Sequence, residues 1–96
     1  MFIIVGYEWC THYHHAKLLL ESIAPTSLIA VTKRGSVGKK ELLANIHILT
    51  TGKTVIGKAV GDTSPQVFVR YPDLIYCLGG DDDVTQNKRL IRRYFI

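Results

Sequence analysis

Residues 63–83, TSPQVFVRYPDLIYCLGGDDD, carry the most specific structural pattern in the sequence. Two apolar runs, at 66–70 and 74–78, flank the turn sequence YPD at 71–73. Because a proline pre-sets the backbone angle of a turn position, the pattern predicts two strands joined as a hairpin. The glycine pair then breaks the second strand, and the three aspartates suit the positively polarised start of a helix, where one of them can act as N-cap.

Upstream of this hairpin, the apolar pattern predicts two strands that alternate with two helices. The run at 2–7 is continuously apolar and rich in β-branched residues, which is typical of a strand covered on both faces. Helical spacing of apolar residues follows Cys10 and stops at Pro25, and the run at 28–32 predicts a second strand. A glycine-bearing loop at 33–40 separates this strand from a second helix, whose apolar positions are Leu42, Leu43, Ile46 and Leu49.

The segment at 52–64 has three glycines and no clean period, so we expect a long loop or a loop with a short strand-like piece. The expected order is then strand, helix, strand, helix, strand, strand, helix. Such an order predicts an α/β fold with one four-stranded mixed sheet and helices on both faces. No internal repeat or change in composition divides the chain, so we expect a single domain over 1–96.

The composition is that of a globular chain, because 47% of its 96 residues are apolar and the formal charge is only +4. No apolar run approaches a membrane span, and no signal peptide is recognisable around 2–7, so we expect a cytoplasmic protein with no membrane contact. Much of the positive charge lies at 88–93, as either a nucleic-acid footprint or a solvated last helical turn. Because no recognition motif accompanies it, we favour the solvated helix and expect no nucleic-acid partner.

Cys10 lies where the first strand gives way to a helix. The first helical turn offers unpaired backbone N–H groups and a partial positive charge, which stabilise a thiolate. The alternative is a buried cysteine that packs as a small hydrophobic residue, and the polar neighbours Glu8, Thr11 and His12 argue against it. We therefore predict Cys10 as a nucleophile, with His12 close enough to donate to its thiolate.

The histidines at 12, 14 and 15 raise the alternative of a metal site. Cys10 and His14 are four residues apart and share a helical face, but a structural zinc site needs four ligands, usually paired at two places. The second pair is missing, because His47 and Cys77 are isolated in the sequence. We therefore expect no bound metal ion.

Two further stretches offer groups to an extended ligand. A cis bond between Ser64 and Pro65 would leave the backbone of Ser64 free to pair with a peptide-like ligand. At 79–83, helix-start N–H groups would hold a carboxylate, while Asp82 or Asp83 would hold an ammonium group, and both charges on one carbon describe an α-amino acid. The alternative for each stretch is structural: a proline before a strand, and ordinary helix capping.

In this order, the stretches CTHY (10–13), TSPQVF (63–68) and GGDDDV (79–84) resemble a glutaredoxin. The family pattern is Cys-x-x-Cys or Cys-x-x-Ser at a helix start, then Thr-Val-Pro-x-hydrophobic-Phe, then Gly-Gly-x-Asp-Asp opening the last helix. The resemblance covers nearly the whole chain and is nearest to short phage and viral glutaredoxins. It implies a thioredoxin-like fold and a monomeric glutathione-dependent thiol–disulfide oxidoreductase. Glutathione would be the co-substrate, and glutathionylated or disulfide-bearing proteins would be the partners.

By this resemblance, Cys10 is the nucleophile and Tyr13 takes the place of the second active-site residue. The family's basic residue before the cysteine is missing, since YEW stands at 7–9. Lys53 or Lys58 would then replace it as the partner of the glycyl carboxylate of glutathione. The remaining residues that the resemblance implies for glutathione are Thr63, Ser64 and Pro65 beside the nucleophile, and Gly80, Asp81, Asp82 and Asp83 at the γ-glutamyl end.

Tyr13 leaves no second cysteine in the motif, so Cys10 cannot close an intramolecular disulfide there. Cys77 lies in the last expected strand, where we expect it to be buried. We therefore predict a monothiol route, in which Cys10 takes glutathione from a mixed disulfide and a second glutathione resolves it. Two alternatives stay open: a non-catalytic glutaredoxin-like binding module, and a glutathione-ligated iron–sulfur carrier. His12 and the bulky Tyr13 disfavour the cluster, because the carrier motif CGFS has phenylalanine and serine at these places.

Overall fold

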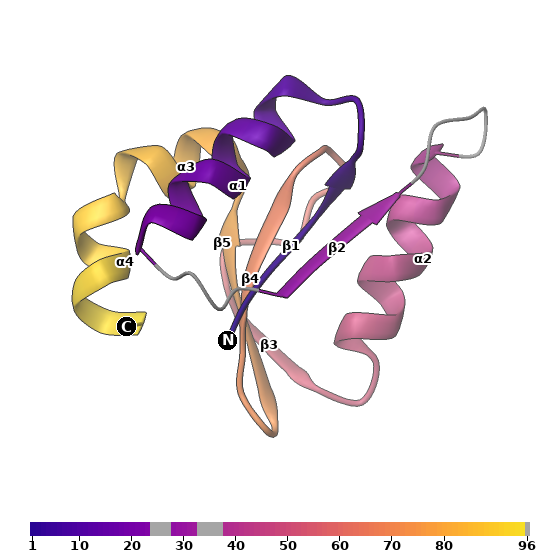
Figure 1. Ribbon diagram of the computed structural model, residues 1–96. Coiled ribbons are helices and arrows are strands. Elements are labelled where there is room, and N and C mark those ends of the chain that lie inside the picture. The colour runs from indigo at the N-terminus through magenta and orange to yellow at the C-terminus, as the bar shows by residue number, and fades with distance from the viewer. Residues whose placement is uncertain (24–27, 33–37, 96) are drawn as a thin grey trace.

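The computed structural model describes residues 1–23, 28–32 and 38–95, which form one α/β layout around a mixed sheet (Figure 1). The strand order is β2-β1-β4-β5-β3. The pairs β1/β2 and β3/β5 are parallel, whereas β1/β4 and β4/β5 are antiparallel. The strands are β1 Phe2–Tyr7, β2 Leu28–Thr32, β3 Thr54–Gly57, β4 Gln66–Arg70 and β5 Leu74–Gly79.

Helices cover both faces of the sheet, as predicted. Figure 1 shows α2 on one side and α1, α3 and α4 together on the other. The α/β class, the mixed sheet and the helices on both faces are therefore confirmed, and the layout is consistent with the thioredoxin-like fold expected from the sequence. The helices are α1 Thr11–Ile23, α2 Gly38–Thr50, α3 Asp81–Gln86 and α4 Lys88–Phe95.

The alternation of side chains along β1 divides the core into two layers. Phe2 and Ile4 pack on the face covered by α1, α3 and α4, in a cluster that also contains Tyr13. Ile3 and Val5 pack on the opposite face, against buried residues of α2. Both faces of β1 are thus buried, which explains why its sequence is continuously apolar.

The structure adds a fifth strand to the predicted four. Residues 54–57 form β3, which pairs in parallel with β5 at the edge of the sheet. Each of its four residues is exposed, so no buried face imposes an alternating apolar pattern on the sequence. The expectation of a loop with a short strand-like piece was therefore close, but it did not place the strand in the sheet.

The last predicted helix is two helices, which meet at Asn87. The Asn87 backbone N–H and side-chain amide both donate to the carbonyl of Asp83, at 3.1 and 2.8 Å. An asparagine side chain that competes for a helical carbonyl favours a helix end, so α3 stops there and α4 begins at the next residue. The N-cap of α3 is Gly80, not one of the aspartates.

The remaining boundaries differ by a few residues from those predicted. Helix α2 begins at Gly38, inside the segment predicted as a loop over 33–40. The predicted helix stop at Pro25 lies outside the described residues. No helix in the part of the chain that the structure describes is long and apolar enough to cross a bilayer.

Candidate functional site

Cys10 links the end of β1 to the start of α1. Its backbone N–H donates to the carbonyl of Tyr7 at 3.1 Å, and its own carbonyl accepts from the N–H of His14 in the first turn of α1 at 3.2 Å. The side chain is half-buried, and its thiol Sγ lies 3.7 Å from the backbone oxygen of Ser64, to which it donates. The strand-to-helix junction therefore places the sulfur against the loop that precedes β4.

A hydroxyl group fixes that loop to β1. The backbone N–H of Tyr7 donates to Ser64 Oγ at 2.9 Å, and the Ser64–Pro65 peptide bond is cis, which is one of the two alternatives that the sequence left open. Gly6 makes room for this approach, because a Cβ at this position would lie 2.8 Å from Ser64 Oγ and 2.6 Å from Tyr13 Cδ2. Position 6 therefore admits only glycine while Tyr13 and Ser64 keep their places.

The buried side chain of Gln66 holds the same loop by hydrogen bonds, and the sequence did not identify Gln66 as a site residue. The side chain is 4% exposed. Its amide nitrogen donates to the backbone oxygen and the hydroxyl of Thr63, at 3.0 and 3.2 Å, and its amide oxygen accepts from the N–H of Gly61 at 3.2 Å. A buried amide with its hydrogen bonds satisfied holds the loop in one shape. The only signal in the sequence was a polar residue at the start of a buried strand.

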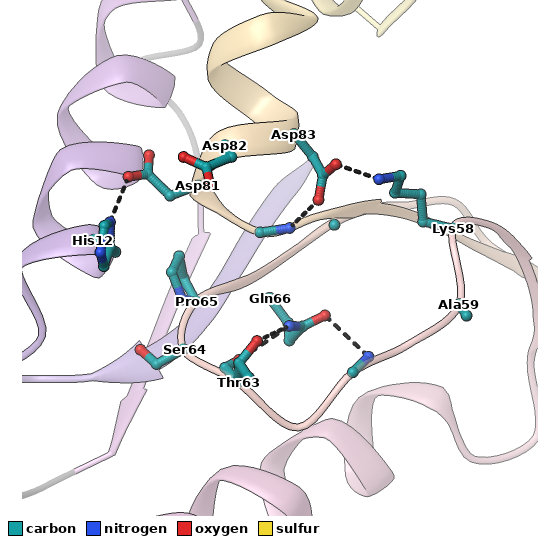
Figure 2. A pocket seen from close by; sticks show the side chains of 13 residues that line it. His12, Lys58, Ala59, Thr63, Ser64, Pro65, Gln66, Asp81, Asp82 and Asp83 are labelled. Carbon is teal, nitrogen blue, oxygen red and sulfur yellow. Dashed lines mark hydrogen bonds and ion pairs between the residues drawn. The ribbon is translucent and has the colours of Figure 1, made fainter.

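A cavity of about 530 Å³ opens beside this loop (Figure 2). It brings together most of the residues predicted to bind glutathione, from two places that are far apart in the sequence. The predicted site residues that line the cavity are His12, Thr63, Ser64, Pro65, Gly80, Asp81, Asp82 and Asp83. The rest of the wall is formed by Lys58, Ala59, Gly61, Gln66 and Gly79. Among the described residues, Cys10 and Tyr13 are not part of this wall.

The three aspartates have different surroundings, although the sequence treats them alike. Asp81 is 8% exposed, and its carboxylate contacts Nδ1 of His12 at 3.1 Å and Nδ1 of His15 at 2.6 Å. Burial acts to raise the pKa of Asp81, but the hydrogen bonds and positive charge of His15 and His12 outweigh it, so the pKa lies below its ordinary value. Asp81 therefore ties α3 to α1 as a carboxylate.

Asp83 is held on the opposite side of the cavity. One carboxylate oxygen pairs with Nζ of Lys58, and the other accepts from the backbone N–H of Gly80 at 2.9 Å. The hydrogen bond from Lys58, followed by that from Gly80, lowers the pKa of Asp83. Figure 2 shows Asp82 between these two pairs, at the rim of the cavity. Within the described ranges, the carboxylate of Asp82 has no hydrogen bond or ion pair.

The predicted catalytic neighbours of Cys10 lie at different depths. The side chain of His12 is 68% exposed and turns toward Asp81, so its ring nitrogen contacts a carboxylate instead of the sulfur. Tyr13 is 2% exposed and belongs to the core cluster, where burial, followed by the charges of Glu21 and Glu8, raises the pKa of its hydroxyl. Tyr13, predicted from the resemblance to take part in catalysis, is thus a packing residue beneath Gly6.

The second cysteine is buried, as the sequence predicted. Cys77 is 0% exposed, and this burial raises the pKa of its thiol. It belongs to the core cluster on the α2 face, whereas Cys10 packs against the cluster on the α1 face. The sheet therefore separates the two sulfur atoms.

Of the two lysines predicted to replace the missing basic residue, Lys58 lines the cavity. Lys53 lies elsewhere, because its Nζ donates to the carbonyl of Pro72 in the β4–β5 turn at 3.0 Å. The stretch before Cys10, which lacks the basic residue of the glutaredoxin pattern, contains an aromatic pair instead. The rings of Tyr7 and Trp9 stack with their centroids 4.8 Å apart, and Trp9 is 51% exposed.

The three histidines near Cys10 do not all approach the same group. The ring of His14 contacts the backbone oxygen of Glu8 at 2.5 Å, away from the pair formed by His12 and His15 with Asp81. Among residues 1–23, 28–32 and 38–95, no group of three or more His, Cys, Asp or Glu side chains is arranged to hold a metal ion.

Comparisons of the chain with protein-family models, curated proteins and solved structures found no match.

Proposed function

We propose that the protein is a glutathione-dependent thiol–disulfide oxidoreductase of glutaredoxin type that acts by a monothiol route through Cys10. One observation carries the proposal. The half-buried thiol of Cys10, at the start of α1, lies 3.7 Å from the carbonyl of Ser64, beside a cavity walled by that loop and by the start of α3. A nucleophile next to a polar ligand cavity is the arrangement that thiol exchange on a bound substrate requires.

The cavity offers partners for the charged groups of glutathione. Its volume of about 530 Å³ lies within the range of small-molecule sites. The carboxylate of Asp82, which has no partner among the described residues, suits the γ-glutamyl ammonium group, and Lys58 suits a carboxylate that replaces Asp83 as its partner. The 63–65 loop, held by Gln66, would pair with the peptide backbone of the ligand.

The proposed exchange balances with glutathione as the only reductant. The thiolate of Cys10 attacks the glutathione sulfur of a protein–glutathione disulfide, and the target protein leaves as a thiolate that takes a proton from water. The thiolate of a second glutathione then attacks the glutathione sulfur bound to Cys10, which releases oxidised glutathione and restores Cys10. We further propose that the targets are glutathionylated or disulfide-bearing proteins and that the protein acts as a monomer in the cytoplasm.

The monothiol route is supported by the positions of the two cysteines. Cys77 is fully buried on the α2 face, and Cys10 packs on the opposite face of the sheet. A disulfide needs Cα atoms within about 7 Å and facing Cβ atoms, so these two residues cannot pair while the sheet stays folded. Resolution by external glutathione is the remaining route.

A non-catalytic glutathione-binding module is the second candidate, and one observation favours it. Cys10 is absent from the described residues that line the cavity, so a ligand can occupy the cavity without touching the sulfur. In this case the protein would use the bound tripeptide or the surrounding surface to recognise a partner.

A coupled glutathione-reduction assay on a glutathionylated peptide separates the two candidates, together with calorimetric titration of glutathione. The proposal predicts activity in the wild type and in the control variant Cys77→Ser, and its loss in Cys10→Ser. Binding of glutathione with no activity in any variant would establish the binding module instead. Absence of both binding and activity would overturn both candidates.

A further inference from the structure

The wall of the cavity beside the 63–65 loop contains more acidic than basic groups. Among the described residues, three aspartates line it, whereas Lys58 contributes its one ammonium group. His12 also lines it, but adds a positive charge only when protonated, and its ring contacts the carboxylate of Asp81. The two remaining carboxylates, those of Asp82 and Asp83, therefore have a single lysine between them.

Lys58 is already paired within this wall. Its Nζ donates to one carboxylate oxygen of Asp83, and Figure 2 shows this pair on the side of the cavity away from His12. A ligand carboxylate can therefore use Lys58 only by taking the place of Asp83. The exchange of one carboxylate for another gains little, because both form the same kind of ion pair with the lysine.

The carboxylate of Asp83 is held in place even without Lys58. Its second oxygen accepts from the backbone N–H of Gly80 at 2.9 Å. Gly79, whose φ is +100°, leaves room for the same carboxylate, because a Cβ at this position would overlap it. A ligand carboxylate at Lys58 would therefore lie beside the negative charge of Asp83, and contacts between like charges disfavour binding.

Asp82 offers a place for one cationic group. Its carboxylate lines the cavity at the rim and has no hydrogen bond or ion pair with any described residue (Figure 2). Glutathione brings one ammonium group, which suits Asp82, and two carboxylates. One carboxylate is attached to the same carbon as the ammonium group, which compensates its charge. The glycyl carboxylate, at the other end of the tripeptide, has no such neighbour.

We propose that the cavity prefers a γ-glutamyl peptide thiol whose glycyl carboxylate is masked as an amide over glutathione itself. An amide removes the one ligand charge that lacks a counter-charge and leaves the Lys58–Asp83 pair intact. Specificity then comes from a repulsive element, the fixed carboxylate of Asp83, as well as from attraction to Asp82. The proposal rests on the proposed function, because it names the thiol that the same site selects.

Calorimetric titration of the wild-type chain with reduced glutathione and with its glycyl amide, both kept reduced by a phosphine, tests the preference without a variant. The two ligands differ only in the terminal group. We expect the amide to bind about 5-fold more tightly at low salt. The difference should shrink at about 0.3 M salt, because salt screens the repulsion between exposed charges.

The variant Asp83→Asn tests the cause of the preference. The asparagine side-chain oxygen can still accept from the N–H of Gly80, but the negative charge is gone and Lys58 is free to pair with the glycyl carboxylate. This variant should bind glutathione at least as tightly as the amide. Asp73→Asn makes the same charge change on the β4–β5 turn, outside the cavity, and should keep the wild-type preference. Circular dichroism should show that both variants are folded.

The outcomes separate this proposal from the proposed function. Glutathione binding as tight as or tighter than that of the amide in the wild type would overturn the preference and leave glutathione as the co-substrate. A preference for the amide that Asp83→Asn retains unchanged would overturn the role of the Lys58–Asp83 pair. Absence of binding by both ligands would overturn the preference together with the glutathione site on which it rests.

Discussion

The backbone N–H of Tyr7 donates to Ser64 Oγ at 2.9 Å, across 57 residues of sequence. This bond joins the end of β1 to the loop whose carbonyl faces the Cys10 thiol. In Ser64→Ala the part-buried N–H of Tyr7 loses its acceptor, and we expect the free energy of unfolding to fall by about 1 kcal/mol. Because the loop also borders the proposed substrate cavity, KM for a glutathionylated peptide should rise more than kcat falls. Urea denaturation and steady-state kinetics measure these two effects.

The matched control is Ser22→Ala, which removes an exposed hydroxyl that donates to the carbonyl of Leu19 at 2.6 Å, on the far end of α1. It should change stability by no more than about 0.5 kcal/mol and leave KM unaltered. A Ser64→Ala variant with wild-type stability and wild-type KM would show that the hydroxyl does not position the loop.

Gly6 and Tyr13 form a second fixed pair at this junction. A Cβ at position 6 would lie 2.6 Å from Tyr13 Cδ2, and the Tyr13 ring is 2% exposed and enclosed by the core. We therefore expect Gly6→Ala to reduce the free energy of unfolding by about 1–3 kcal/mol. Gly38→Ala is the control, since its Cβ would make only an ordinary contact with Tyr7 at 3.4 Å.

A double-mutant cycle with Tyr13→Leu tests whether the ring is the cause. If it is, Gly6→Ala should be less damaging in the Tyr13→Leu background than in the wild type. Equal losses in both backgrounds would assign the effect to other neighbours of position 6.

The carboxylate of Asp81 makes stability depend on pH in the acid range. Its pKa is depressed in the folded state by His15 and His12, against the effect of burial, so the folded chain holds the proton less tightly than the unfolded chain. The stabilisation that the Asp81 carboxylate contributes is fully present above its unfolded-state pKa of about 3.9, and it is lost as pH falls through its folded-state pKa. We expect Asp81→Asn to lower stability at pH 7 by about 1 kcal/mol, since both histidines are largely exposed.

Urea denaturation between pH 7 and pH 3 measures this effect. Below pH 5 the free energy of unfolding should fall less steeply in Asp81→Asn than in the wild type. Asp73→Asn makes the same charge change on the exposed turn between β4 and β5 and should keep the wild-type slope. Identical slopes for Asp81→Asn and wild type would mean that the Asp81 contacts do not stabilise the fold.

Cys77 should be inert in the folded protein. It is 0% exposed, and burial raises the pKa of its thiol, so the reactive thiolate is scarce as well as enclosed. We expect N-ethylmaleimide to modify only Cys10 under native conditions, as read by peptide mass spectrometry, and Cys77 to react as urea unfolds the chain. The Cys10→Ser variant should take up no label before unfolding. Labelling of Cys77 as fast as Cys10 would contradict its place in the core.

The sequence predicted the parts of the fold where burial imposes a pattern. The continuous apolar run of β1 indicated a strand because the strand is buried on both faces. The apolar runs on either side of the proline turn indicated β4 and β5 because these strands also have buried residues. It did not indicate how β3 joins the sheet, since an exposed edge strand carries no alternation. The division of the last helix at Asn87 depends on a side-chain hydrogen bond that no periodicity reveals.

Only part of the candidate site could be predicted. The resemblance, and not local turn chemistry, implied that the 63–65 loop and the 80–83 turn serve one site, and the structure brings both to one cavity. The contacts between elements were not accessible from the sequence. His15 and Asp81 are 66 residues apart, and no pattern in the sequence pairs them, so the structural role of Asp81 emerged only from the fold.

The proposed monothiol route requires that Cys10 form a mixed disulfide with glutathione that external glutathione can remove. Intact-mass spectrometry of the native chain after exposure to oxidised glutathione, followed by reduced glutathione, measures both steps. We expect one glutathionyl group, located on Cys10 by peptide mapping, absent from Cys10→Ser and released by reduced glutathione. An unmodified chain, or an adduct that Cys10→Ser retains, would rule out this route.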